Sequence, residues 1–323
     1  MTEENTTNEV KEVKKEVITE LEAVTEVEEA KKTPRKELKK EVIQEEEATD
    51  NNPANYDVNL TSLLQAGAHF GHREDRWNPK MGEFIFTTRN KISIINLDKT
   101  LEAWDKVNKY VKDIASTGGS FLFVGTKEQA KRPIMEAANA CGINYVNNRW
   151  LGGTLSNFNT IKKSISKLTK LEKLLVESEK PDTKIKIAKK EKLMLQRQID
   201  KLESNLGGIK SMRKIPSVMF INDVNKDLNA VKEARKLHIP VIALIDTNSD
   251  PDLVSFPIPS NDDSSRVIKL FAMGIAKAIN EGFKDFESNQ RKGKAKAKKA
   301  DASSTKVSET IVEEKKPSKS AKK

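Results

Sequence analysis

Short hydrophobic runs alternate with helical patterns through the middle of the chain. Three runs, at residues 121–124, 218–221 and 241–245, are apolar at every position, and a weaker one covers residues 143–146. Runs that do not alternate with polar residues are typical of strands buried on both faces of a parallel sheet. Their repetition with helices between them predicts an α/β fold with right-handed crossovers. Ligands of such sheets bind beyond the carboxyl ends of the strands.

One segment, residues 156–206, interrupts this alternation. It has no strand pattern, and Leu and Ile recur at intervals of three and four in two stretches separated by a polar turn near Pro181. This spacing predicts two helices that pair as an antiparallel coiled-coil hairpin. Between Lys162 and Glu203 there are 13 basic and 7 acidic side chains. A basic hairpin of this kind is suited to reaching along a polyanion, and the alternative is a solvated coiled coil.

The two ends of the chain differ from the middle in composition. Residues 1–55 carry 16 acidic and 9 basic side chains, residues 288–323 carry 12 basic and 4 acidic ones, and neither segment contains an aromatic residue. Such segments cannot bury enough apolar area to offset the entropy lost on ordering. We therefore predict a disordered acidic extension, a folded domain over residues 56–287 and a disordered basic tail. A weak helical spacing in the acidic extension leaves open a helix that docks on a partner.

The overall charge and the single cysteine exclude several classes of protein. The 323 residues include 58 Lys and Arg against 48 Asp and Glu, which gives a formal net charge of +10. A lone Cys141 permits no internal disulfide and no zinc finger built from paired cysteines, and it fits a reducing compartment. No stretch approaches the roughly 20 apolar residues that cross a bilayer. We expect a cytoplasmic protein that does not act at a membrane.

A glycine and a lysine, Gly125 and Lys127, follow the first hydrophobic run, and Thr126 and Gln129 have the spacing of a capping box. A helix that starts here can hold a phosphate. The alternative function is therefore a nucleotide- or sugar-phosphate-binding enzyme with a flavodoxin-like domain. A phosphate-binding loop needs more glycines than one, and no nucleophile elbow or Ser-His-Asp order occurs. We expect no catalysis, no cofactor and no small-molecule substrate.

The chain has few metal-binding side chains. Three histidines and one cysteine are available, namely His69, His72, His238 and Cys141. A zinc site would need at least three of these four to converge. We expect no metal site and assign packing or hydrogen bonding to the histidines.

Two polar clusters combine guanidinium, amide and indole groups. The first covers residues 73–80, followed by 89–91, in a predicted loop, and the second covers residues 147–154, just before the predicted hairpin. Arginine can bridge phosphates with two hydrogen bonds, and tryptophan can stack on an unpaired base. The alternative for both tryptophans is that they pin loops onto the core. The residues that we predict to contact RNA lie in these clusters, in the basic hairpin and just after it: Arg73, Arg76, Trp77, Lys80, Arg89, Lys91, Arg149, Trp150, Lys162, Lys163, Lys210 and Arg213.

Seven segments resemble the bacterial small-subunit ribosomal protein S-two family. They occur in order between about Leu60 and Gly282 and include AGAHFGH at 66–72, RWNPKM at 76–81, FVGTK at 123–127 and NRWLGGTL at 148–155. The resemblance implies a flavodoxin-like α/β domain with a protruding helical hairpin. It also implies a structural role in the small ribosomal subunit, with small-subunit rRNA and neighbouring ribosomal proteins as partners. Support of subunit assembly and the seating of ribosomal protein S-one belong to the same expectation.

The chain departs from this family at several positions. The family often has His where this chain has Asn148, and Glu74 and Asp75 bring negative charge where the family usually has polar or basic residues. The acidic extension and the basic tail lie outside the resemblance. We expect binding to rRNA through distributed Lys and Arg contacts to phosphates, with little readout of base sequence.

Overall fold

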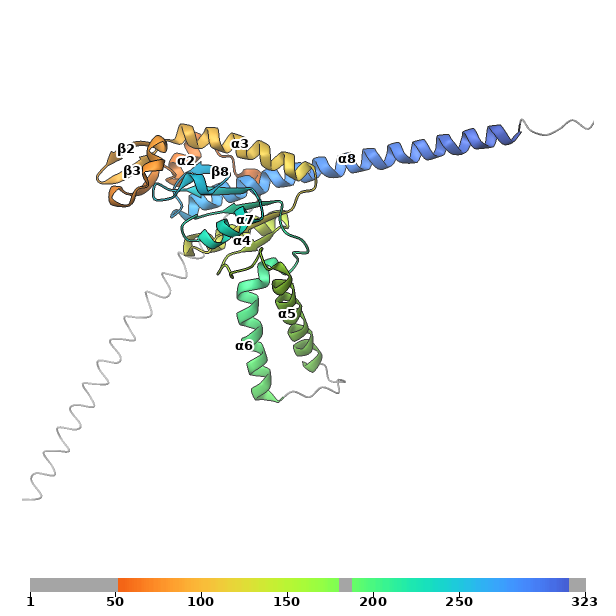
Figure 1. Ribbon diagram of the computed structural model, residues 1–323, viewed down its shortest axis with the longest axis horizontal. Coiled ribbons are helices and arrows are strands. Elements are labelled where there is room, and N and C mark those ends of the chain that lie inside the picture. The colour runs from red at the N-terminus through yellow and green to blue at the C-terminus, as the bar shows by residue number, and fades with distance from the viewer. Residues whose placement is uncertain (1–51, 180–187, 314–323) are drawn as a thin grey trace, which may run out of the picture. The chain divides into compact units, whose positions relative to one another are not determined.

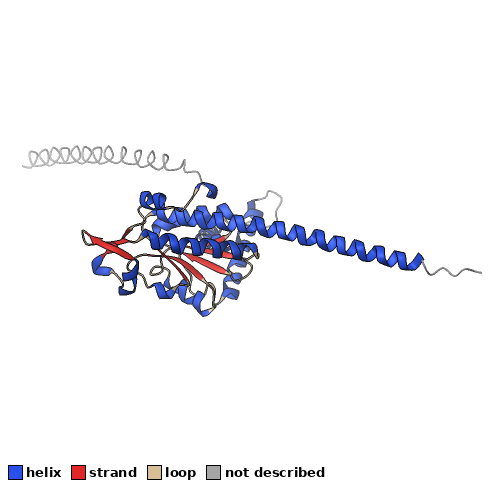
Figure 2. Ribbon diagram, turned by 90° about the horizontal axis from the view of Figure 1, so that it is seen from above, coloured by secondary structure: helices blue, strands red, loops and turns tan. Residues whose placement is uncertain are grey.

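The computed structural model describes residues 52–179 and 188–313, with side chains in 52–178 and 188–290. Its centre is a five-stranded parallel sheet in the order β5-β4-β6-β7-β8. The strands, drawn in red in Figure 2, are β4 (Phe121–Val124), β5 (Asn144–Val146), β6 (Val218–Ile221), β7 (Val241–Ile245) and β8 (Phe256–Pro259). The predicted α/β fold with a parallel sheet is confirmed.

Four of these strands coincide with the predicted hydrophobic runs, and β8 is the one that the sequence pattern missed. Pro257 and Pro259 lie within β8. Proline cannot donate to a ladder, so it is confined to edge strands, and β8 is an edge of this sheet. Two prolines in four residues concealed the strand signal.

Helices cover both faces of the sheet (Figure 2). On one face the strands pack against α3 (Leu97–Ser116), α4 (Glu128–Cys141) and α8 (Ser265–Glu313). On the other face they pack against α7 (Leu228–Lys236), the start of α5 (Phe158–Glu179) and the end of α6 (Lys189–Leu206). Alternate strand side chains enter the two cores, for example Phe123 the first and Leu122 the second. This double burial explains why the runs contain no polar residue.

The predicted capping role of Thr126 is wrong. Helix α4 begins at Glu128 with Lys127 as its N-cap, and no side chain caps it. The Thr126 hydroxyl instead donates to Asp227 at 2.8 Å, and its backbone N–H donates to the same carboxylate at 3.2 Å. Asp227 lies at the start of α7, so the sequence around Thr126 could not reveal this acceptor.

A second, antiparallel sheet contains β1 (Phe70–Arg73), β2 (Ile85–Arg89) and β3 (Ile92–Ile95), in the order β1-β3-β2. Asn90 and Lys91 join β2 to β3 with positive φ angles of 52° and 61°. Two residues with positive φ give the tight turn whose twist matches a hairpin. The segment between β1 and β2, predicted as a loop, contains two short 3₁₀ helices, η2 (Glu74–Arg76) and η3 (Pro79–Phe84).

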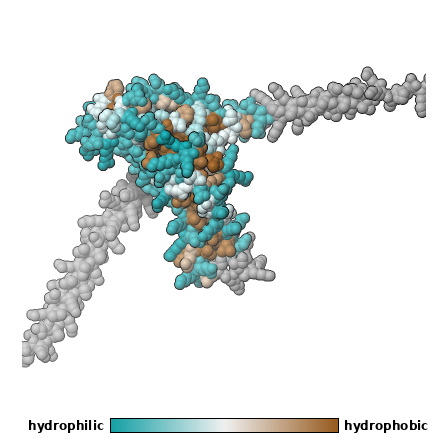
Figure 3. All heavy atoms as spheres, in the orientation of Figure 1, coloured by the Kyte–Doolittle hydropathy of each residue, from teal (hydrophilic) through white to brown (hydrophobic). Residues whose placement is uncertain are grey.

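Helices α5 and α6 lie side by side (Figure 1). Leu168 of α5 is fully buried, and Ile199 of α6 is nearly so. Farther along the pair, Val176, Leu193 and Met194 are exposed, and hydrophobic atoms appear among hydrophilic ones in Figure 3. The supercoiling of this pair stays a prediction, and residues 180–187 between the helices lie outside the described ranges.

The remaining elements are short, apart from α8. They are η1 (Pro53–Asn55), α2 (Leu60–Ala66), η4 (Gly207–Ile209) and η5 (Pro251–Leu253). The backbone of α8 is helical through Glu313, beyond the predicted domain end at residue 287, and its Ala- and Lys-rich sequence has a high helix propensity. Its core side chains run from Val267 to Phe283. Residues 1–51, which hold nearly all of the acidic extension, and residues 314–323 lie outside the described ranges.

Candidate nucleic-acid interface

The three-stranded sheet brings three predicted cations to one end. Arg73 at the end of β1 and Arg89 at the end of β2 both pair with Ile92 of β3, and Lys91 occupies the adjoining turn. The backbone N–H of Glu74 donates to the Lys91 carbonyl at 3.0 Å, which ties η2 and its Arg76 to the same end. All four cations are exposed. We call them the sheet-end cluster.

Acidic side chains reduce the positive charge beside this cluster. Arg73 forms an ion pair with Asp75 at 2.8 Å. Lys80, in η3, lies 2.9 Å from Asp250 and 2.6 Å from Asp252, and its hydrogen bonds to these two carboxylates raise its pKa. Lys80 is exposed but already neutralised, so it is a weaker phosphate ligand than the cations of the sheet-end cluster.

The two tryptophans behave differently. Trp77 is 43% exposed, and its ring lies against Gly82, so an exposed indole remains for stacking. Trp150 is only 8% exposed, and its indole N–H donates to Glu233 of α7 at 3.1 Å. Trp150 therefore matches the structural alternative to base stacking, in which the ring packs its loop against the core.

Glu233 organises the whole loop around Trp150. Its carboxylate also accepts hydrogen bonds from the backbone N–H groups of Gly153 at 2.8 Å, Leu155 at 2.9 Å and Ser156 at 3.0 Å. Burial opposes ionisation, but the donors, chiefly Ser156 and Trp150, outweigh it and lower the pKa of Glu233. Arg149, next to Trp150, stays exposed. Sequence reasoning missed Glu233, because its partners are about 80 residues away along the chain.

Four further predicted cations lie around the ends of α5 and α6, and all are exposed: Lys162, Lys163, Lys210 and Arg213. Lys162 lies over the ring of Phe158, 4.7 Å from its centroid. Lys210 contacts Glu172 of α5 at 2.6 Å, which ties the segment after η4 to the helical pair. Together with Arg149 these four residues form a second group, which we call the hairpin-base cluster.

The structure opposes a phosphate site at Gly125–Lys127. The Lys127 ammonium lies 2.6 Å from Asp263, 2.8 Å from Asp262 and 3.3 Å from Asp223. Burial opposes the charged form of Lys127, but its hydrogen bonds to Asp262 and Asp263 raise its pKa. An incoming phosphate would meet these carboxylates, so a nucleotide- or sugar-phosphate-binding enzyme is not favoured.

Carboxylates at the strand ends also surround His72. Its Nδ1 lies 2.9 Å from Asp246, and ligand atoms of His72, Asp246 and Asp262 all lie within 4.8 Å of one another. These donor types suit a divalent cation. Burial and the charges of Asp223 and Asp246 raise the pKa of Asp262 to about 7. The sequence argument against a metal weighed the His and Cys residues together and residues 246–250 separately as a calcium loop, so it did not anticipate that His72, Asp246 and Asp262 converge.

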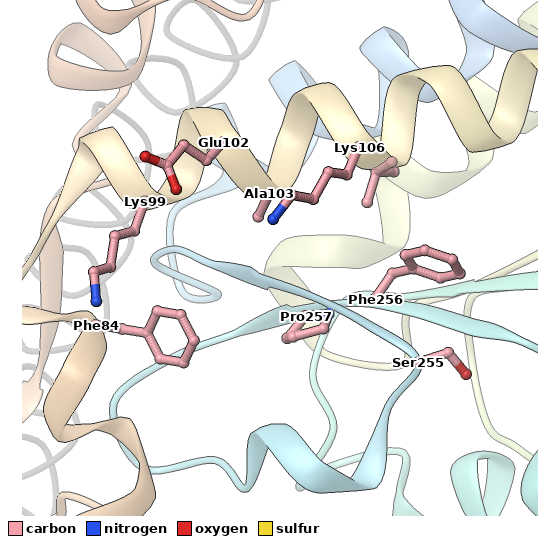
Figure 4. Close-up of a pocket in the computed structure, with 9 residues that line it drawn as sticks. Phe84, Lys99, Glu102, Ala103, Lys106, Ser255, Phe256 and Pro257 are labelled. Carbon is pink, nitrogen blue, oxygen red and sulfur yellow. The ribbon is translucent and has the colours of Figure 1, made fainter.

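A pocket of about 440 Å³ lies between α3 and β8 (Figure 4). Lys99, Glu102 and Lys106 project from α3, above Phe256 and Pro257 of β8. The hydroxyl group of Ser255, which also lines the pocket, accepts a hydrogen bond from the backbone N–H of Val241 at 3.3 Å. No histidine and no cysteine lines this pocket. No helix in the described part of the chain has the length and apolar content to cross a membrane.

Comparisons with known proteins agree on one family. Residues 63–282 match the family described as Ribosomal protein S2. The chain is 49% identical over 256 residues to the small ribosomal subunit protein uS2 of a Nitratiruptor species, which covers 79% of this chain and 94% of that protein. It is 52% identical over 225 residues to the uS2 protein of Mycobacteroides abscessus, covering 70% of this chain and 80% of that protein.

Proposed function

The chain belongs to the Ribosomal protein S2 family, and we propose that it binds small-subunit rRNA through the sheet-end and hairpin-base clusters. As a member of this family it is a structural protein of the small subunit of the cytoplasmic ribosome and not an enzyme. Its partners are therefore rRNA and other ribosomal proteins. The RNA-contacting residues within this chain are our proposal.

One observation carries the proposal. All ten Lys and Arg side chains predicted from the sequence to contact RNA are exposed. Arg73, Lys80 and Lys210 are paired with carboxylates, and the other seven form no ion pair with the residues that the structure describes. Exposed cations distributed over a surface are typical of phosphate contacts, which position a protein on RNA without reading its bases.

A double charge reversal tests the proposal. Arg76→Glu with Arg149→Glu changes one cation in each cluster, and both side chains are exposed outside the core. We expect incorporation into small subunits to fall roughly tenfold or more, because two phosphate contacts become repulsive. The melting temperature should stay within about 1 °C of the original, since surface changes have little effect on stability.

The matched control reverses two exposed lysines of α3 outside both clusters, Lys106→Glu with Lys109→Glu. It changes the net charge by the same amount. Equal incorporation of the original chain, the control and the Arg76/Arg149 variant would contradict the assignment of the two clusters. Family membership would stand.

We infer in addition that the chain helps to seat ribosomal protein S-one. The family resemblance supports this inference. Exposed aromatic side chains on and beside the three-stranded sheet also support it, because Phe70 is 50% and Phe86 is 73% exposed. Exposed aromatic residues are enriched where proteins contact one another.

A further inference from the structure

A pocket of about 480 Å³ lies at one edge of the parallel sheet, and neither cluster named above includes it. Strand β5 forms this edge, and among the described strands it pairs only with β4. The pocket is lined by Lys131 of α4, by residues of and after β5, and by the end of α6 with the start of η4. These residues include Tyr145, Asn147, Asn148, Glu203 and Gly208. Its volume falls in the range of roughly 300–1,000 Å³ that is usual for sites that hold small groups.

Close backbone packing shapes this pocket. A Cβ atom on Gly208 would lie 2.2 Å from the carbonyl oxygen of Tyr145 and 2.8 Å from its ring. Helix η4 can therefore lie directly against Tyr145 only because residue 208 is glycine. An aromatic ring and a bare backbone thus form part of the wall, which suits a flat group better than a branched one.

The polar groups of the pocket suit a neutral, flat ligand. One cation, Lys131, and one acid, Glu203, face the pocket, so it lacks the excess of positive charge that a phosphate site needs. The Asn148 amide N–H donates to Asn205 at 3.3 Å, and that of Asn147 donates to the Lys131 carbonyl at 3.4 Å. In the described part of the chain no donor reaches the side-chain carbonyl oxygen of either asparagine. Each amide thus offers an acceptor and a remaining N–H, the combination that hydrogen-bonds base edges.

Two residues of the hairpin-base cluster lie close to the pocket lining along the chain. Arg149 directly follows Asn148, and Lys210 lies two residues after Gly208. Lys210 is paired with Glu172, so exposed Arg149 is the cation that can hold a phosphate beside the pocket. We propose, building on the proposed function, that the pocket receives one unpaired nucleobase of small-subunit rRNA, while Arg149 holds a neighbouring phosphate. Unpaired bases are the parts of RNA that proteins read by stacking and by amide hydrogen bonds.

The test uses small subunits reconstituted with the full chain or with Asn147→Ala and Asn148→Ala together. Dimethyl sulfate and a carbodiimide, which together modify the pairing edges of all four bases, probe the rRNA. In subunits that contain the double variant we expect one or two unpaired bases to become at least threefold more reactive, because the amides that hold them are gone. Asn139→Ala is the matched control, since Asn139 is an exposed amide on α4 outside the pocket.

A second variant tests the same proposal by a change in another wall of the pocket. Ser204→Trp, on the exposed end of α6, fills the opening without removing an amide, and it should expose the same bases. If both variants incorporate and the reactivity pattern matches that of the original chain, the pocket proposal is overturned and the proposed function stands. If the original chain does not join the subunits, the proposed function and the pocket proposal fail together.

Discussion

Glu233 shows how a single side chain can decide the geometry of a distant loop. One carboxylate accepts hydrogen bonds from the Trp150 indole, from three backbone N–H groups and from the Ser156 hydroxyl. These donors belong to the segment that leads from β5 into α5, so Glu233 fixes both the loop that carries Arg149 and the start of the helix. A charged acceptor with several donors is worth more than an ordinary neutral hydrogen bond.

We predict that Glu233→Ala lowers the free energy of unfolding by about 2–4 kcal/mol, because several partly buried donors lose their acceptor. Glu233→Gln should cost less, since its amide oxygen still accepts. Urea unfolding followed by circular dichroism measures both changes. Glu102→Ala, an exposed glutamate on α3, is the control and should stay within about 0.5 kcal/mol of the original.

The same prediction has a pH signature. The pKa of Glu233 is lowered in the folded protein, so its ionised form contributes stability above its unfolded pKa, near 4.5. This contribution is lost as the pH falls through the lower, folded pKa. The gap between the original chain and Glu233→Ala should therefore be widest near neutral pH and shrink below about pH 4. A gap of constant size would show that the carboxylate charge is not the source.

Among the secondary-structure elements, the hydrophobic pattern of the sequence predicted the strands that are buried on both faces and missed strands that are largely exposed. The strands β4, β6 and β7 are buried at every position, so their runs are continuous and predictable. The exposed strand β2 has only one partly buried position among five, and it went unrecognised. Strand signals come from contact with a core, so a strand with little core contact has little signal.

Helix α8 permits a prediction about which part of it is structural. Its core side chains run from Val267 to Phe283, and Phe286 lies against Gly118. Ending the chain after Gln290 should leave the free energy of unfolding within about 0.5 kcal/mol of the original, since every core side chain of α8 that the structure describes precedes that residue. Ending it after Lys277 removes Ile279, which is fully buried, and should cost more than about 3 kcal/mol. Thermal melts compare the two, and a large loss for the longer chain would place core contacts beyond residue 290.

At the scale of the whole molecule, the surroundings of each cation matter more than the total positive charge, because they decide whether the cation is available to an anion. Lys127 lies among carboxylates at the strand ends, whereas the sheet-end and hairpin-base clusters are exposed. The carboxyl ends of the parallel strands, where this fold class usually binds ligands, are therefore closed to anions. We therefore place the proposed contacts with RNA around that edge and at the base of α5 and α6.

This arrangement predicts release of the chain from small subunits as salt rises. If most of the ten cations contact phosphates, the association constant should fall by a factor of at least about a hundred between 50 and 200 mM monovalent salt at fixed magnesium. Sucrose gradients with immunoblotting measure the bound fraction. The Arg76→Glu and Arg149→Glu variant should show a salt dependence shallower by about two units in log–log slope.

The same gradients test the proposed seating of ribosomal protein S-one. Where the organism supplies that protein, it should leave the subunits in the fractions that lose this chain. Retention of the chain at all salt concentrations would point to protein contacts in place of phosphate contacts. Retention of S-one after the chain has left would contradict the seating role alone.

Composition, periodicity and motif order were enough to establish the parallel sheet, the basic character of residues 162–203 and the family. These properties are local, because the burial of a strand and the charge of a helix depend on the types of consecutive residues. Contacts between distant residues decided the rest: that Trp150 is held by Glu233, that Thr126 binds Asp227, and that Lys127 is surrounded by acids. The partners in these pairs lie between 83 and 135 residues apart along the chain. Only folding brings these residues together, so no pattern of consecutive residues predicts their contacts.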